Sequence, residues 1–272
     1  MHILLLGHRE IASNIALSML VTAMPTHRYS IMLSDSVAAK SAPPELVELA
    51  NLEQSLCDEL EYRSPQLDHG ILSFDQLADR TGAPAQILAQ PNSGEGLAVI
   101  AALQPDLIIS IRYRRILGTA AIAIPRWGVL NLHSGLLPEY RGVMATFWAM
   151  LNNEPSIGCT LHHIVDGTID TGPVVGRAAV ATDRRRTYLA NVLSLYAPGC
   201  SMVVEAVARI ENGRATTARE QPKEGKYFSA PGVDDIARFR QADWRLFDGG
   251  ELHRFLRERY NAPILAAGTG SA

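Results

Sequence analysis

A chain of 272 residues with 47% hydrophobic residues can bury a large core, which excludes a peptide-sized module. Its formal net charge of −3 gives no electrostatic reason to expect a nucleic acid as the main partner. Cys57, Cys159 and Cys200 are odd in number and lack C-x-x-C spacing, which excludes a disulfide framework and a zinc ribbon. We expect them to be buried thiols in a reducing compartment.

The chain shows no targeting or membrane segment by composition. The apolar run at residues 3–6 ends at a glycine followed by charges, and is too short for a secretory signal. No window approaches the roughly 18 consecutive apolar residues that a membrane span needs. We therefore predict a soluble, cytoplasmic protein that does not bind a membrane.

In the first half of the chain, apolar runs typical of strands alternate with segments of helical periodicity. Strands are predicted over residues 2–6, 29–34, 86–88, 106–110 and 128–133, and helices over residues 11–22, 44–60, 74–80 and 94–103. Gly7 is interpreted as a tight turn after the first strand. Continuous apolar strands between helices favour an α/β fold with a Rossmann-like, mostly parallel sheet flanked by helices.

The second half begins with a predicted helix over residues 143–152 and two extended segments, 158–165 and 174–181, that should pair with each other. Residues 187–211 are predicted to be a long helix, interrupted around Pro198 and Gly199 and ended by Asn212-Gly213. The remaining residues are charged, aromatic and punctuated by glycine. We predict a main domain over residues 1–210, a small C-terminal α+β appendage over 211–265, and a small-residue tail over 266–272 that is disordered.

Two polar residues interrupt the apolar segment WGVLNLHSGLLPEYRG, residues 127–142. Asn131 and His133 are two apart, so they share one face of the predicted strand. Ligands of open α/β sheets bind beyond the carboxyl ends of the strands, which is where His133 falls. An Asn amide can donate to a developing oxyanion, and a His can stabilise the same charge or move a proton.

This pair lacks a carboxylate that could orient the imidazole ring. The segment HHIVDGTIDTGPVV, residues 162–175, supplies Asp166 and Asp170 in a predicted loop between two extended segments. On the residues alone, either aspartate could complete the constellation.

The motif NLHSGLLPEYRG followed by DGTIDTGP resembles the signature of the 10-formyltetrahydrofolate-dependent formyltransferases. This family includes glycinamide ribonucleotide transformylase, methionyl-tRNA formyltransferase and the sugar N-formyltransferases. The upstream segment QPNSGEGLAVIAALQPDLIISIRYRRIL extends the resemblance, which covers residues 85–180 well, the first strand and helix loosely, and the C-terminal part poorly.

The resemblance implies a catalytic triad of Asn131, His133 and Asp170, with 10-formyltetrahydrofolate as the co-substrate. The residues that it implies for binding the pterin ring are Arg115, Ile116 and Leu117, with Ile164, Val165 and Asp166 from the loop that leads to Asp170. Those implied for the formyl-bearing side are Gly135, Leu136, Leu137 and Pro138. Relatives usually have Ser at the position of Gly135, and we expect the missing hydroxyl to loosen this loop without touching the chemistry.

In the expected reaction a neutral amine attacks the formyl carbon, and Asn131 and a protonated His133 stabilise the tetrahedral oxyanion. Asp170 keeps the imidazolium charged and, directly or through water, takes the proton of the amine. The reaction requires no metal and no covalent enzyme intermediate.

The acceptor is predicted to be a small amine, either an amino sugar carried on a nucleotide or a hydroxyornithine-like compound. A tRNA acceptor is disfavoured because the tRNA enzyme carries a larger C-terminal barrel and a basic surface, and a hydrolase because it carries a further domain before the catalytic one. From other functional classes, an NAD-dependent oxidoreductase and a non-catalytic binding protein stay open. The aromatic C-terminal segment is compatible with a homodimer.

Other candidate sites have simpler explanations. Adjacent residues of a strand face opposite ways, which argues against a metal site at His162 and His163. The turn GHREIA lacks the later glycines of a dinucleotide-binding motif. Residues 184–186, three arginines, are interpreted as a solvated loop rather than a phosphate site, and Phe239, Trp244 and Phe247 as part of a small packed subdomain.

Overall fold

The protein is built on one seven-stranded sheet, as the computed structural model shows for residues 1–35, 42–63 and 70–260. The strand order is β3-β2-β1-β4-β5-β7-β8, with the first five strands parallel and β7 and β8 antiparallel to their neighbours. The strand bounds are β1 His2–His8, β2 Arg28–Ser34, β3 Gln86–Ile87, β4 Leu107–Ser110, β5 Val129–His133, β7 Ser156–Ile164 and β8 Val174–Ala181. The predicted α/β fold with a mostly parallel sheet is confirmed.

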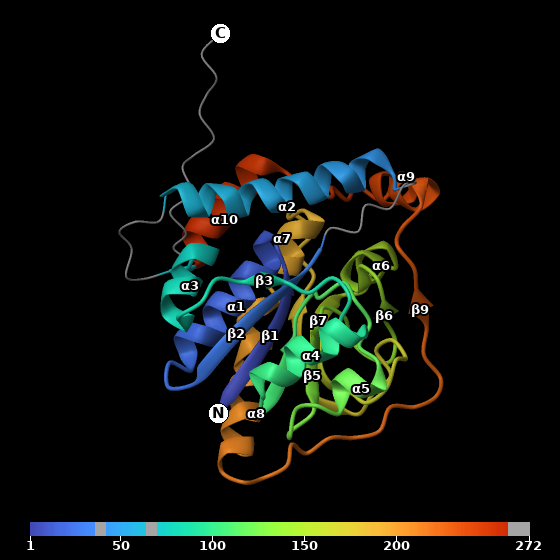
Figure 1. Cartoon of the computed structure of the whole chain (residues 1–272). Coiled ribbons are helices and arrows are strands. Elements are labelled where there is room, and N and C mark those ends of the chain that lie inside the picture. Colours follow the sequence, from blue (N-terminus) through green and yellow to red (C-terminus); the bar gives the residue numbers. More distant parts are fainter. Residues whose placement is uncertain (36–41, 64–69, 261–272) are drawn as a thin grey trace.

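Helices cover both faces of this sheet (Figure 1). Alternate residues of β1 enter two different cores, because successive side chains of a strand point to opposite faces. Ile3 and Leu5 join the larger core, with α1 (Ile11–Ala23) and α8 (Tyr196–Glu211). Leu4 and Leu6 join a smaller core with α4 (Gly94–Leu103) and α5 (Thr119–Ile122).

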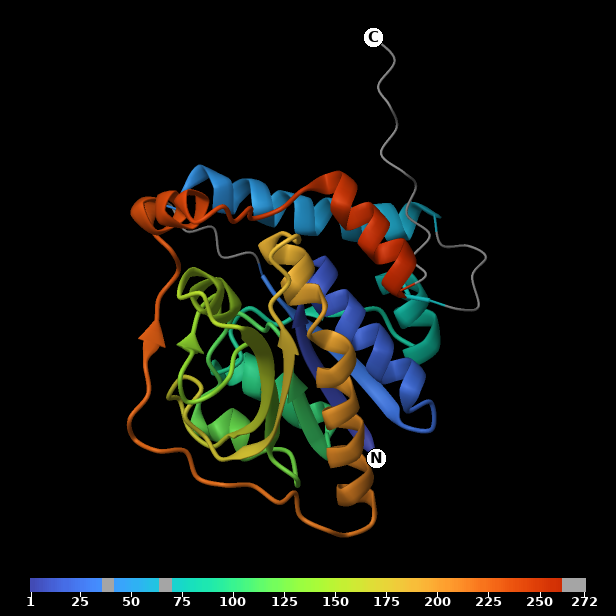
Figure 2. The same cartoon turned by 180° about the vertical axis from the view of Figure 1, so that it is seen from behind.

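A layer of helices crosses the end of the sheet where β1 and β4 finish. It consists of α2 (Pro44–Arg63), α9 (Val233–Gln241) and α10 (Gly249–Tyr260), which lie together in both views (Figures 1 and 2). Arg240 pairs with Glu45, and the ring of His253 approaches the Glu59 carboxylate at 3.1 Å, so the C-terminal helices are tied to α2. The remaining helices are α3 (Phe74–Thr81), α6 (Ala145–Leu151) and α7 (Tyr188–Leu193).

The chain reaches this layer through an extended segment, which we call the C-terminal strap, residues 212–232. The strap leaves α8 at the opposite end of the molecule and runs along its outside (Figure 2). On the way β9 (Tyr227–Phe228) pairs in parallel with β6 (Arg141–Gly142), which forms a second, two-stranded sheet. The domain boundary at residue 210 stays a prediction, and the tail over 266–272 lies outside the described residues.

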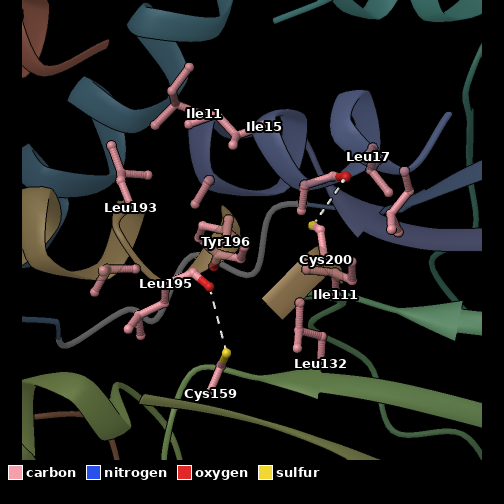
Figure 3. Close-up of a cluster of buried hydrophobic side chains, with 14 of the residues drawn as sticks. Ile11, Ile15, Leu17, Ile111, Leu132, Cys159, Leu193, Leu195, Tyr196 and Cys200 are labelled. Atoms are coloured by element: carbon pink, nitrogen blue, oxygen red, sulfur yellow. Dashed lines mark hydrogen bonds between the residues drawn. The ribbon is translucent and has the colours of Figure 1, made fainter. Parts of the chain in front are cut away.

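The larger core contains the expected buried thiols (Figure 3). All three cysteines are buried, as predicted, and the reducing compartment stays a prediction. The Cys159 Sγ lies 3.6 Å from the Leu195 carbonyl oxygen, and the Cys200 Sγ lies 3.7 Å from that of Ala16. Burial raises the pKa of the Cys159 thiol to about 12, so this sulfur stays a thiol and acts as a packing group.

Residues Tyr188–Glu211 form the one stretch in the described part of the chain that is long and apolar enough to cross a membrane. However, 61% of its most apolar window is buried inside the fold, against α1 and strands β7 and β8. Its hydrophobicity is therefore explained by the core.

Two local predictions are wrong. Gly7 does not form a turn but lies within β1, where a Cβ atom would overlap the Ser13 Oγ of the helix packed against it. The long helix breaks at Ser194 and Leu195, before Pro198. Pro198 falls in the first turn of α8, where the backbone N–H that proline lacks would have no partner within the helix.

Candidate active site

Strand β5 presents the two polar residues at the junction between the parallel and antiparallel parts of the sheet. Asn131 pairs in register with Ser110 of β4 on one side and with His162 of β7 on the other. His133 is 8% exposed and ends the strand opposite Thr160. The pair therefore sits on an internal strand of the sheet, between β4 and β7.

The loop after β5 folds back onto His133. The Tyr140 carbonyl oxygen lies 2.7 Å from the His133 Nε2. Thr160 holds the loop in place, because its Oγ1 donates to the Gly135 carbonyl at 2.7 Å and accepts from the Leu137 N–H at 3.1 Å. The orientation of the imidazole is thus fixed by backbone groups.

Asp170 reaches the same place from another segment. Strand β7 ends at Ile164, opposite Val129, and the following loop doubles back toward the middle of β5. The Asp170 Oδ2 lies 3.4 Å from the His133 Nδ1, and its Oδ1 lies 3.5 Å from the Asn131 Nδ2. The three side chains that the sequence proposed as a triad therefore converge.

The environment of Asp170 favours its charged form. Burial alone raises the pKa of this carboxyl group, but the nearby His133 and His162 rings and the N–H of Gly142 outweigh burial and lower the pKa to about 2. The Gly142 N–H donates to the Asp170 Oδ2 at 2.9 Å. Both nitrogens of His133 face oxygen acceptors, so the imidazolium form satisfies both of them.

His162 belongs to this site, although the sequence argument considered it only as a metal ligand. Its Nε2 lies 3.0 Å from the Asn131 Nδ2, and its Nδ1 lies 2.9 Å from the His163 carbonyl oxygen. The same Nε2 lies 3.4 Å from the Asp170 Oδ1. His162 therefore contacts two members of the proposed triad and restrains the Asn131 amide.

The segment after β4 and the loop that leads to Asp170 each expose an apolar side chain. Ile116 is 54% exposed and Val165 is 53% exposed. A Cβ atom added at Gly167 would stand 3.9 Å from the Ile116 Cγ2. The loop that carries Asp170 therefore lies against the segment after β4. Exposed apolar walls beside a few polar groups are typical of a site for a flat ring.

The other residues that the resemblance implies for folate binding differ in their burial and in their contacts. The Arg115 guanidinium pairs with both oxygens of Asp35, while Leu117 is buried in the smaller core. Ile164 packs against that core as well, and Asp166 is exposed, with its carboxylate accepting from the Thr168 N–H at 2.8 Å. Of the two candidate aspartates, the structure thus brings only Asp170 to Asn131 and His133.

Gly135 lies behind the imidazole of His133. Gly135 and Leu136 line a cavity of about 210 Å³ together with residues of α6 and β7, whereas Leu137 and Pro138 are buried. A Cβ atom on Gly135 would stand 2.5 Å from the Ala145 Cβ, 2.6 Å from the His133 Nε2 and 2.8 Å from the Tyr140 carbonyl oxygen. This position therefore has no room for a side chain, and the expectation that the missing hydroxyl leaves the chemistry untouched stays a prediction.

Comparison with known proteins agrees with this geometry. Residues 82–193 match the family model described as formyl transferase, and this segment contains all three converging side chains. The chain therefore contains a segment, residues 82–193, that is similar to the formyl transferase domain.

Similar formyltransferases include the methionyl-tRNA formyltransferases of Mycolicibacterium vanbaalenii and Magnetococcus marinus. The first is 34% identical over 172 residues, which are 63% of this chain and 54% of the relative. The second is 32% identical over 158 residues, which are 57% of this chain and 49% of the relative. The chain thus spans about half the length of the curated relatives it matches.

Solved structures of formyltransferases share the fold. A 4-N formyltransferase from Francisella tularensis superposes with a TM-score of 0.58 at 15% identity, covering 89% of this chain and 87% of that one. A sugar N-formyltransferase from Shewanella sp FDAARGOS_354 gives a TM-score of 0.56 at 16% identity, with the same coverage of each chain. At such low identity these likenesses show the fold alone.

The protein also buries a group of charges where β1 and β4 end. Arg112 pairs with Glu10 and with Glu53 of α2, at 3.1 Å for the latter, and Arg114 donates to Glu10 at 2.6 Å. Burial raises the pKa of Glu53 to about 7, against a lowering effect of Arg114. These ion pairs attach α2 to the end of the sheet.

The three arginines at residues 184–186 lie in a largely exposed loop, as predicted, and the Arg185 side chain is 90% exposed. Arg184 stacks over the Trp244 ring at 4.7 Å and Arg186 over the Phe255 ring at 4.8 Å, while Arg185 pairs with Asp183 at 3.1 Å. Two of them thus help to attach the C-terminal helices. Across the described ranges, no group of three His, Cys, Asp or Glu side chains is placed to hold a metal ion.

Proposed function

We propose that this protein transfers a formyl group from 10-formyltetrahydrofolate to the amine of a small acceptor. One observation carries the proposal: an amide, an imidazole and a buried, ionised carboxylate meet at Asn131, His133 and Asp170. Acyl transfer to an amine needs a donor for the developing oxyanion and a group that accepts the proton of the amine. The three side chains supply both.

Each residue has a role that follows from its contacts. The amide nitrogen of Asn131, restrained by His162, donates to the developing oxyanion. His133 adds a positive charge, which the ionised Asp170 maintains at 3.4 Å. Asp170 then accepts the proton of the amine, directly or through water, so the chain needs no nucleophile of its own.

The site has features that fit the co-substrate. 10-Formyltetrahydrofolate supplies the activated formyl group when bound. The exposed side chains of Ile116 and Val165 offer apolar walls for a pterin ring beside the triad, and the loop around Asp166 offers backbone polar groups. We assign the ring to this region, and the formyl-bearing side to the loop that begins at Gly135.

For the acceptor we favour a small amine, such as a nucleotide-linked amino sugar or a hydroxyornithine-like compound. The formal net charge of −3 does not favour a long contact with nucleic acid. Methionyl-tRNA is the second candidate, because similar relatives are named methionyl-tRNA formyltransferases. Under either proposal we expect the protein to act in the cytoplasm.

The test is a transfer assay with the purified protein. It is incubated with 10-formyltetrahydrofolate and, in separate reactions, with nucleotide-linked amino sugars, hydroxylated amines, methionyl-tRNA or water alone. Tetrahydrofolate release is followed by absorbance and the product is identified by mass spectrometry. We expect a formamide product with one class of small amine. Release without any amine would indicate a hydrolase, and tight NAD binding without folate binding would contradict the proposal.

A further inference from the structure

The C-terminal strap contacts both segments of the candidate active site at one residue. The Gln221 Nε2 donates to the Asp170 carbonyl at 3.0 Å and to the Gly172 carbonyl at 2.7 Å. Its Oε1 accepts from the Arg141 Nη2 at 3.1 Å. One amide side chain therefore connects the loop of Asp170 with the segment that follows the β5 motif.

The hydrogen bonds of Gln221 to the loop of Asp170 hold an unfavourable backbone conformation. Asp170 has a φ of 55°, in the left-handed region that residues with a side chain rarely adopt. This conformation turns the carboxylate back toward β5, although β7 ends beside Val129. Because Gln221 bonds the carbonyls on both sides of Thr171, it restrains the backbone that sets the carboxylate's direction.

The hydrogen bond between Gln221 and Arg141 helps to place an N–H donor against the Asp170 carboxylate. Arg141 is 9% exposed, and its guanidinium also donates to the Pro222 carbonyl of the strap at 3.0 Å. The next residue is Gly142, whose N–H donates to the Asp170 Oδ2. Holding Arg141 thus holds the Gly142 N–H against Asp170.

We propose that Gln221 is a positioning residue that sets the place of the Asp170 carboxylate relative to the His133 imidazole. The inference rests on the proposed function, in which that pair maintains a charged imidazolium. Gln221 itself touches neither reacting group. It acts through the backbone of Asp170 and through Arg141.

A purely structural role would be to keep the strap attached, but the strap has other attachments. Arg219 and Val174 exchange two backbone hydrogen bonds, at 2.8 and 2.9 Å. Tyr227 and Phe228 pair with β6. We therefore expect the strap to stay docked when the side chain of Gln221 loses its hydrogen bonds.

The test compares Gln221→Met with Glu220→Gln in the full chain. Methionine keeps the length and volume of glutamine but cannot make these hydrogen bonds, and Glu220 is an exposed neighbour in the same strap. For Gln221→Met we expect kcat to fall roughly 10- to 100-fold, with the KM of the amine changing less than about twofold. Glu220→Gln should keep the wild-type values.

The pH dependence of kcat distinguishes a positioning role of Gln221 from a general loss of folded enzyme. The nearby His133 and His162 rings and the Gly142 N–H hold the pKa of the Asp170 carboxyl group low, so a displaced Asp170 becomes harder to ionise. The acid limb of kcat should therefore move to higher pH in Gln221→Met. A variant that only lowers the fraction of folded enzyme would lower kcat without narrowing the profile, and that result would overturn the inference.

A second measurement does not depend on the acceptor. The surroundings of the His133 ring can be followed by the NMR chemical shifts of its ring protons at one pH, with the signals assigned by their loss in His133→Gln. We expect these chemical shifts to change in Gln221→Met and to stay at their wild-type values in Glu220→Gln, because only the first variant displaces the carboxylate that lies 3.4 Å from the His133 Nδ1. Unchanged chemical shifts in Gln221→Met would overturn the role of Gln221, whereas failure of wild-type enzyme to formylate any amine would overturn the proposed function instead.

Gln221→Ala keeps the inference testable if the methionine variant does not fold. It removes the amide group that bonds the two carbonyls and Arg141, and it adds no charge near Asp170. The same narrowing of the pH profile is expected for a folded Gln221→Ala, and a profile of wild-type width would count against the inference.

Discussion

Placing a serine at position 135, as the resemblance described above suggests for this position, should damage this protein. The damage comes from the Cβ atom, because that atom would stand within 2.5–2.8 Å of Ala145, His133 and the Tyr140 carbonyl oxygen. None of these is the far end of a flexible side chain. We therefore expect Gly135→Ser and Gly135→Ala to be affected to a similar degree.

Two magnitudes follow from this packing. Overfilling a well-packed site costs roughly 1–3 kcal/mol, and a cost near 2 kcal/mol lowers Tm by roughly 4–8 °C in a chain of this size. The displaced Tyr140 carbonyl also releases the His133 Nε2, which it accepts from at 2.7 Å. Since a misplacement of about 1 Å can cost about 100-fold in rate, kcat should fall by a comparable factor.

The assay measures unfolding free energy in denaturant together with formyl transfer. Gly94→Ala is the matched control, because an added Cβ there meets nothing within 4 Å. Wild-type stability and turnover in Gly135→Ser would refute the reasoning, since they would require a different path for the loop after β5. A loss in Gly135→Ser that is absent from Gly135→Ala would assign the damage to the hydroxyl instead.

Three further predictions test the candidate site and its support. Asp170→Asn should lower kcat on the order of 100-fold or more. Its loss of unfolding free energy relative to wild type should shrink as pH falls from about 4 to 2, because the depressed pKa of Asp170 stabilises the fold only above that window. A loss that does not depend on pH in denaturant unfolding would contradict this. His162→Phe should lower kcat about 10-fold or more with little effect on the KM of the amine, through release of the Asn131 amide; steady-state kinetics showing full activity would remove His162 from the site. The unfolding free energy of Glu53→Gln should rise relative to that of wild type as pH rises from about 4.5 through 7, since a carboxyl group with a raised pKa favours folding only while protonated. If the unfolding free energies of the two proteins change in parallel between pH 4 and 8, the raised pKa is excluded.

Much of the fold follows from local patterns in the sequence. Alternation of apolar strands and periodic helices predicted the parallel strands, and helix α4 was predicted with the bounds observed, Gly94–Leu103. Residue spacing also predicted that Asn131 and His133 share a face. Asp170 was one of two candidates on the residues alone, and the resemblance to a family selected it. The catalytic roles of all three stay predictions.

What the sequence did not reveal depends on long-range pairing. His162 contacts Asn131 because β7 runs antiparallel to β5 in one particular register, which no local pattern specifies. Gln221 lies 51 residues from Asp170 in a segment without strand or helix periodicity. Gly7 was misinterpreted because close packing by Ser13 and a tight turn both favour glycine.

The strap also decides how small a working fragment of this protein can be. A piece cut to the family-matched segment, residues 82–193, would retain Asn131, His133 and Asp170 yet lose Gln221 and the partner strand of Arg141–Gly142. Anyone transplanting this chemistry onto another scaffold would therefore need to carry over residues through Phe228, or supply a replacement brace for the aspartate.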